Sequence, residues 1–186
     1  LYNKEKTKII KYPEGKKDLE YTILEGVTNI QNEAFLGCNS LTNIVIPEGV
    51  TSIGYSAFSN CTNLTSIDIP TSVIYIQEKA FSGCSSLTNI VIPKGVTSIE
   101  SYVFNGCSNL SNITIPNGVT KIGYEVFYNC GSLTSIIIPE GVTSIGYDAF
   151  VNCTSLISID IPASVTYIGE GTFSGCNSLE NINIDK

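Results

Sequence analysis

The side chains that could do chemistry in this chain are seven cysteines and a sparse set of carboxylates, and the sequence contains no histidine. Thiols form disulfides, bind zinc or act as nucleophiles. A disulfide framework has an even number of cysteines, a zinc site has clustered pairs such as C-x-x-C, and a nucleophile needs an activating base. None of these conditions is met, so we expect reduced, buried thiols that pack as small apolar residues. The cysteines instead recur every 23 residues, at Cys38, Cys61, Cys84, Cys107, Cys130, Cys153 and Cys176.

The carboxylates offer no better case for catalysis. Histidine is the commonest general base, and without one no catalytic triad can form. A parallel β-helix lyase or hydrolase would need two acids close together on one strand face. Asp68 and Asp160 share a position in the pattern but lie four repeats apart, roughly 19 Å at ~4.8 Å per coil, against about 5 to 9.5 Å for a glycosidase pair. No repeat concentrates the three or four carboxylates of a calcium site, so we predict no enzyme, no metal and no cofactor.

The cysteine spacing belongs to a repeat that fills most of the chain. Full copies begin at Leu41, Leu64, Leu87, Leu110, Leu133 and Leu156, without insertion or deletion. We expect a hairpin-like lead-in over residues 1–17 and one solenoid over residues 18–186, made of a degenerate repeat 18–40, six full repeats 41–178 and a partial repeat 179–186. A fixed period of this length is typical of a leucine-rich repeat solenoid, in which each coil buries its apolar side against its neighbours.

The copy that begins at Leu133 shows how one coil should fold. Ile136 and Ile138 alternate with outward residues, which predicts a short strand that ends at the following proline, since proline cannot donate to a ladder. Val142 and Ile145 predict a second short extended piece on another side of the coil. The fold class is therefore a right-handed leucine-rich repeat solenoid with short parallel β-strands, about seven to eight turns long. Its leucine, isoleucine, phenylalanine and cysteine ladders should lie inside.

The segment around Ala149 and Phe150 should form one short helical turn in each coil. The position that follows it, held here by Asn152, contains only glycine or asparagine throughout the chain. These two residues most readily adopt a left-handed backbone, which commonly ends a helical turn.

Composition restricts the partners. The chain has 42% hydrophobic and 15% charged residues, a net charge of −7 and no arginine, which is a poor match for nucleic acid because lysine and arginine contacts to phosphate dominate that affinity. No apolar run reaches transmembrane length. The chain lacks an initiator methionine and a secretion signal, and we expect it to be a piece of a longer protein.

The pattern LxxIxIPxGVTSIGxxAFxxC resembles the BspA-like, or Treponema pallidum-type, leucine-rich repeats over residues 18 to 186. The first copy departs from it, because Leu24 replaces the proline. The resemblance implies an exported protein, secreted or on the cell surface, that adheres to host proteins such as the extracellular-matrix proteins fibronectin and fibrinogen, or to other cells. That family has no catalytic residues to carry over.

The outward strand positions are the candidate ligand-binding face, because they vary while the core positions stay constant. Small polar side chains with exposed aliphatic ones among them suit a protein ligand or, alternatively, a carbohydrate, on the long surface of a solenoid. The candidate residues are Asn43, Val45, Ser66, Asp68, Asn89, Val91, Asn112, Thr114, Ser135, Ile137, Ser158 and Asp160.

The sequence at the C-terminal end indicates a second candidate contact surface. Ile182 and Ile184 should lie in a strand that no further coil covers, so either the native chain continues past Lys186 or copies of the chain self-associate through this end of the solenoid.

Overall fold

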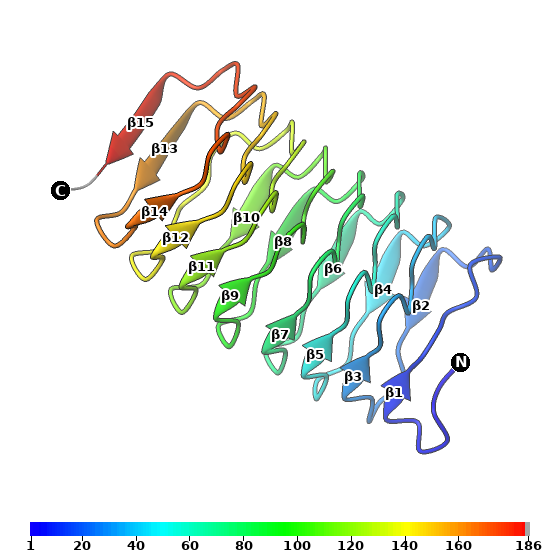
Figure 1. Cartoon of the computed structure of the whole chain (residues 1–186). Helices are drawn as coiled ribbons and strands as arrows, with labels where there is room; N and C mark the ends of the chain where they lie inside the picture. Colours follow the sequence, from blue (N-terminus) through cyan, green and yellow to red (C-terminus); the bar gives the residue numbers. More distant parts are fainter. Residues whose placement is uncertain (185–186) are drawn as a thin grey trace.

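The computed structural model describes residues 1–184, and these form a parallel β-solenoid of about eight turns, with the two termini at opposite ends (Figure 1). The turns contribute short strands to two rows, and all but one of the turns between residues 18 and 184 contribute to the first row. The first row contains the strands that precede the prolines: β2 (Glu20–Thr22), β4 (Asn43–Val45), β6 (Ser66–Asp68), β8 (Asn89–Val91), β10 (Asn112–Thr114), β13 (Ser158–Ile161) and β15 (Asn181–Ile184). The second row contains β1 (Lys8–Ile9), β3 (Asn29–Ile30), β5 (Ser52–Ile53), β7 (Tyr75–Ile76), β9 (Ser98–Ile99), β11 (Lys121–Ile122), β12 (Ser144–Ile145) and β14 (Tyr167–Ile168).

Most strands pair in parallel with their equivalents in the next coil, and within the repeats each paired residue lies beside its counterpart 23 positions along the chain. Ile53 pairs with Ile76, and Ile122 pairs with Ile145. The second extended piece predicted at Val142–Ile145 is confirmed by β12. At the N-terminal end, β1 pairs in parallel with β3, and Tyr2 forms an antiparallel bridge with Ile9.

The phenylalanines form one continuous stack along the core from Phe35 to Phe173. Neighbouring rings lie 5.1 to 5.8 Å apart between centroids, with interplanar angles of 7 to 18°. Tyr12 adds a further ring, stacked 5.5 Å from Phe35. Phe104 and Cys107 are completely buried, which confirms the repeat register predicted from the sequence.

The cysteines form a second internal ladder, with a hydrogen bond that their spacing did not suggest. All seven are free thiols, as predicted, and six are buried. The Cys61 thiol donates to the carbonyl oxygen of Phe35 at 3.0 Å, and the equivalent bond joins Cys107 to Phe81 at 3.2 Å. From Cys61 onwards, each thiol thus links its coil to the phenylalanine carbonyl of the preceding one, whereas the Cys38 thiol donates to Leu36 within its own coil. Burial raises the pKa of Cys61 from 9.0 to about 12.

The prediction of one short helical turn in each coil is wrong: no residue in the range 1–184 is helical. In the coil that contains Phe58, alternate amides behave differently. Ser59 donates to Ser56 within the coil, whereas Phe58 and Asn60 donate to Ala80 and Ser82 of the next coil at 2.8 and 2.7 Å. The segment is therefore a run of β-turns whose other amides extend the coil-to-coil ladder.

Two left-handed residues per coil explain why a helix cannot form there. The predicted glycine or asparagine position is left-handed in every coil, for example at Asn152 with φ 58°. A second left-handed position lies four residues earlier, and an α-helix cannot run through it. It is held by Glu33, Ser56, Lys79, Tyr102, Glu125, Asp148 and Gly171.

Both strand rows are interrupted between the same two coils, 64–86 and 87–109. Pairing links β6 to β4 and β8 to β10, but β6 and β8 are not paired, and β7 and β9 are likewise unpaired. These coils remain joined through the turn segment, where Phe81 donates to Val103 at 3.0 Å and Gly83 donates to Asn105 at 2.7 Å. Before the first-row strands, the Thr88 amide also donates to the Thr65 carbonyl at 3.3 Å.

The strand predicted at residues 135–137 is also not formed. Ile137 makes only an isolated bridge to Asp160. The Thr134 amide does not donate to the Ser111 carbonyl, whereas Ser111 and Ile157 donate to their counterparts in the preceding coils. Ile136 nevertheless points inward and Ile137 outward, as predicted.

The last strand, β15, leaves Ile182 and Ile184 exposed. Self-association through this end stays a prediction. Residues 185 and 186 of the expected partial repeat lie outside the described residues.

Truncation of one ring in the phenylalanine stack should destabilise the solenoid strongly. We expect Phe104→Ala to lower the free energy of unfolding by about 3 to 5 kcal/mol, because it leaves a cavity in a fully buried layer. Urea denaturation followed by circular dichroism measures this. A loss below about 1 kcal/mol would show that neighbouring coils collapse into the gap.

Glycine at a second left-handed position should stabilise the chain. Glu33 is exposed with φ 57°, so Glu33→Gly should raise stability by about 1 kcal/mol because glycine removes the steric cost of that conformation. Glu48→Gly, an exposed glutamate outside the left-handed set, is the matched control and should be neutral or destabilising. Equal effects of the two substitutions on the urea midpoint would contradict the explanation.

The buried thiols should make the protein sensitive to alkali. The folded pKa of Cys61 is about 12 instead of 9.0, so above pH 9 the unfolded chain loses thiol protons that the folded chain retains. This contribution to stability is complete below pH 9 and is lost as the pH rises towards 12. We expect Tm to fall across this window by about 2–4 °C for each kcal/mol lost, and to fall less steeply in Cys61→Ala. A wild-type profile that stays flat throughout would contradict this.

Candidate functional site

The twelve predicted face residues flank the central isoleucine of the first-row segment in six coils. Asn43 and Val45 lie on either side of Ile44, and the same arrangement recurs up to Ser158 and Asp160. Ser135 and Ile137 flank the buried Ile136 in the same way, although no strand forms there. All twelve are exposed or half-buried, because successive side chains of a strand point to opposite sides.

Three aliphatic side chains stand out on this face because they are exposed although they are hydrophobic. Val45 is 47% exposed, Val91 61% and Ile137 84%. Most of the other face positions carry an amide, a hydroxyl or a carboxylate. Apolar side chains exposed among polar ones are the arrangement expected at the centre of a protein interface.

The middle coils bring part of the predicted set together. A shallow groove of about 210 Å³ is lined by Asn89, Val91, Asn112, Thr114, Ser135 and Ile137, together with the isoleucines between them. Val91 also lines two neighbouring hollows of about 490 and 310 Å³, which extend from the face over the ends of the strands. Val91 is thus common to all three depressions.

The other predicted residues do not join this groove. Val45 pairs with Asp68 on the N-terminal side of the break between β6 and β8. Asp160, on the C-terminal side, accepts a hydrogen bond from Asn183 at 2.7 Å. The structure therefore separates the candidates into a central group and two flanking groups.

Two residues at this surface were not identified from the sequence. Lys94 lines both larger hollows beside Val91, and Asn117 lines one of them. They occupy the position that follows the proline, which holds Glu48, Thr71, Lys94, Asn117, Glu140 and Ala163 through the chain. Variation at this position next to an invariant proline is the signal that could have identified them.

Exposed tyrosines lie on the side of the second row. The rings of Tyr124 and Tyr147 are 5.6 Å apart, and those of Tyr147 and Tyr167 are 6.1 Å apart. This tyrosine-bearing side is separate from the outward face of the first row, and it provides a natural control for binding experiments.

Metal-binding clusters and membrane-spanning helices are both absent from the described residues. Residues 1–184 contain no group of three or more histidine, cysteine, aspartate or glutamate side chains able to hold a metal ion. Within the same range, no helix has the length and apolarity required to cross a membrane.

The stacked coils, the internal ladders and the row of short strands define a leucine-rich repeat protein. The model of the BspA type leucine rich repeat region matches in six copies, over residues 14–130 and 76–186. The chain belongs to the BspA-type leucine-rich repeat family, and leucine-rich repeats are generally a protein-interaction scaffold.

Solved structures agree with this assignment. The leucine-rich repeat protein TpLRR of T. pallidum is 30% identical with a TM-score of 0.84, and the match covers 96% of this chain and 86% of that one. A leucine-rich repeat protein of Eubacterium ventriosum is 32% identical with a TM-score of 0.87, and the match covers 95% of this chain but 48% of that protein. The pneumococcal vaccine antigen PcpA shares the fold at 21% identity, with a TM-score of 0.57. No match was found among curated proteins.

Proposed function

We propose that this chain is a non-enzymatic adhesion and protein-interaction module that binds a partner protein through the outward face of the first strand row. The proposal places the contact on the central group of residues from Asn89 to Ile137. Membership of the BspA-type family supports an interaction role, since leucine-rich repeat proteins are generally non-enzymatic scaffolds.

The observation that carries this proposal is the exposure of Val91 and Ile137. These side chains lie on the same face two coils apart, with Thr114 between them, and the groove of about 210 Å³ runs across all three. Burial of such side chains by a partner would contribute about 25 cal/mol per Å² of apolar surface removed from water. The amides of Asn89 and Asn112 then form a polar rim.

Location at a cell surface, or secretion, is part of the same proposal. It is supported by the resemblance of the repeats to exported adhesins. Host extracellular-matrix proteins are the partner class that this resemblance suggests. The acidic chain, with net charge −7 and no arginine, suits such a protein partner better than nucleic acid.

The double variant Val91→Glu, Ile137→Glu tests this face. Both side chains point outward, so the fold and Tm should be unchanged, whereas two carboxylates in the centre of an interface should weaken binding by more than about thirtyfold, or ~2 kcal/mol. Binding to immobilised fibronectin and fibrinogen, beside a glycan array, provides the measurement.

The matched control is Tyr124→Ala, Tyr147→Ala on the tyrosine-bearing side, which should bind as the wild type does. If the glutamate variant binds unchanged and the tyrosine variant does not, the binding face lies on the second-row side. If the wild-type chain binds the glycan array but neither protein, the partner of this face is a carbohydrate instead of a protein.

A further inference from the structure

One pair of neighbouring coils lacks two backbone hydrogen bonds that the other coil pairs make along the second row. In the other coil pairs, the amide before the second-row strand and the amide after it both donate to carbonyl oxygens of the preceding coil. For example, the Thr120 amide donates to Thr97 at 2.9 Å and the Gly123 amide to Ile99 at 2.8 Å. Between β7 and β9, within the described part of the chain, the Thr97 amide does not bond to the Ile74 carbonyl, nor the Glu100 amide to the Ile76 carbonyl.

The gap coincides with side chains at one position. The residue after each second-row strand is Ile10 in the lead-in, followed by Gln31, Gly54, Gln77, Glu100, Gly123, Gly146 and Gly169 along the repeats. The glycines allow close approach, because a Cβ on Gly123 would lie 2.6 Å from the backbone nitrogen of Ser101. Within the repeats from residue 18 onwards, Gln77 and Glu100 are the one consecutive pair in this series that both carry side chains. At the lead-in, Ile10 and Gln31 also both carry side chains, but the Gln31 amide still bonds to the Ile9 carbonyl at 3.0 Å, so two side chains do not by themselves interrupt the ladder. We attribute the separation of the β7 and β9 coils to the particular space that the Gln77 and Glu100 side chains need.

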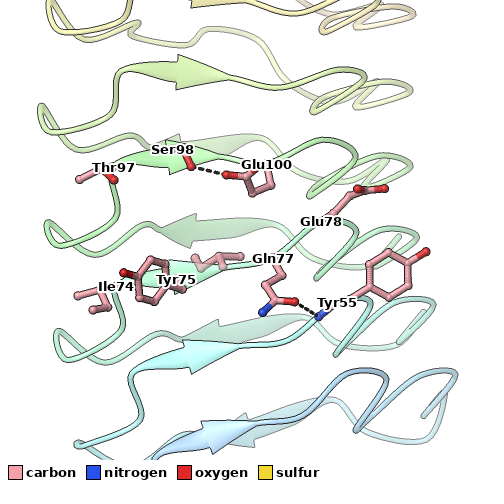
Figure 2. Close-up of a pocket in the computed structure, with 9 residues that line it drawn as sticks. Tyr55, Ile74, Tyr75, Gln77, Glu78, Thr97, Ser98 and Glu100 are labelled. Carbon is pink, nitrogen blue, oxygen red and sulfur yellow. Dashed lines mark hydrogen bonds between the residues drawn. The ribbon is translucent and has the colours of Figure 1, made fainter.

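The separation leaves a cleft of about 450 Å³ (Figure 2), within the range of small-molecule sites. Figure 2 shows Ile74 and Tyr75 at one end, Gln77 in the middle, and Tyr55 and Glu78 at the other end. The opposite wall is formed by Thr97, Ser98 and Glu100. The Gln77 side-chain oxygen accepts a bond from the Tyr55 amide at 3.1 Å, so its amide group remains available as a donor.

The polar groups of this cleft select the chemistry of the ligand. The Thr97 and Glu100 amides are donors and the Ile74 and Ile76 carbonyls are acceptors, so a ligand must both donate and accept over a short distance. A hydroxyl does both, whereas an ammonium or guanidinium group has no acceptor. The Glu100 carboxylate, which accepts a hydrogen bond from the Ser98 hydroxyl, disfavours an anion, whereas the charge of Glu78 is paired with Lys79 at 3.5 Å. The Tyr75 ring, 64% exposed, offers an apolar surface beside these polar groups.

We propose that the cleft between β7 and β9 is a binding site for a neutral saccharide unit. The sugar hydroxyls bond to the backbone groups that the interrupted ladder leaves available, and one face of the sugar ring packs on Tyr75. This site lies on the second row, so it is independent of the protein-binding face around Val91.

The first test uses backbone amide NMR of the wild-type chain. The probes are methyl glycosides of glucose, galactose, mannose and N-acetylglucosamine at millimolar concentration, with methyl glucuronide and N-acetylarginine amide as the anionic and cationic comparisons. We expect at least one neutral glycoside to shift the Thr97 and Glu100 amide signals in a saturable manner. If none does, or if only a charged probe does, the proposal is overturned.

Variants locate the site. Glu100→Gly removes the side chain that holds the coils apart, so the ladder should close, Tm should not fall, and affinity for the glycoside should drop at least tenfold. Gln31→Gly, which also removes a long polar side chain at the equivalent position of another coil, is the matched control and should bind as the wild type does. Tyr75→Ala removes the packing surface without touching the ladder and should also weaken binding at least tenfold. Unchanged binding in both Glu100→Gly and Tyr75→Ala would overturn the site.

The outcome is separable from that of the protein-binding proposal. The Val91→Glu, Ile137→Glu variant should retain glycoside binding, because neither residue lines this cleft. Loss of glycoside binding in that variant, with an unchanged Tm, would contradict the assignment to the second row.

Discussion

The rest of the structure depends on one constraint, the alignment of equivalent backbone positions from coil to coil along the solenoid axis. Once each residue lies beside its counterpart 23 positions away, every inward side chain meets a copy of itself. The phenylalanine rings then stack at 5.1 to 5.8 Å, and each cysteine thiol from Cys61 onwards reaches a phenylalanine carbonyl of the preceding coil. A single inserted residue would shift every later strand and turn residue away from its counterpart, which explains why the copies contain neither insertions nor deletions.

Much of this arrangement could be predicted because repetition converts a weak local signal into a strong one. One phenylalanine in a short segment is ambiguous, but the same residue at a fixed interval identifies a core ladder. The left-handed position at Asn152 was predictable because only glycine and asparagine occupy it. The exposure of Val91 and Ile137 followed from strand alternation, and the groove joins them as neighbours on one face.

What the sequence could not predict depends on contacts between coils. The left-handed backbone at Glu33 and Lys79 leaves no trace in residue type, because ladder bonds hold an ordinary side chain in a conformation that it disfavours. This second left-handed position is also the reason that the segment forms a run of β-turns instead of the expected helical turn. Predicting the cleft would have required a comparison of Gln77 with Glu100 in the next coil, since neither residue is unusual within its own repeat. Lys94 was overlooked because the end of a strand, rather than its outward face, brings it beside Val91.

The interruption between the coils of β7 and β9 also has a mechanical consequence. The termini lie at opposite ends of the stack (Figure 1), so a pull applied between them is carried in series through every interface between coils. In such a series arrangement all interfaces bear the same load, and the weakest one yields first. Here that interface retains its turn-segment bonds and the bond from the Thr88 amide to Thr65, but lacks strand pairing in both rows. Under tension the solenoid would therefore part near its middle, leaving two shorter stacks that each keep a paired second row, so the molecule would lengthen in a discrete step.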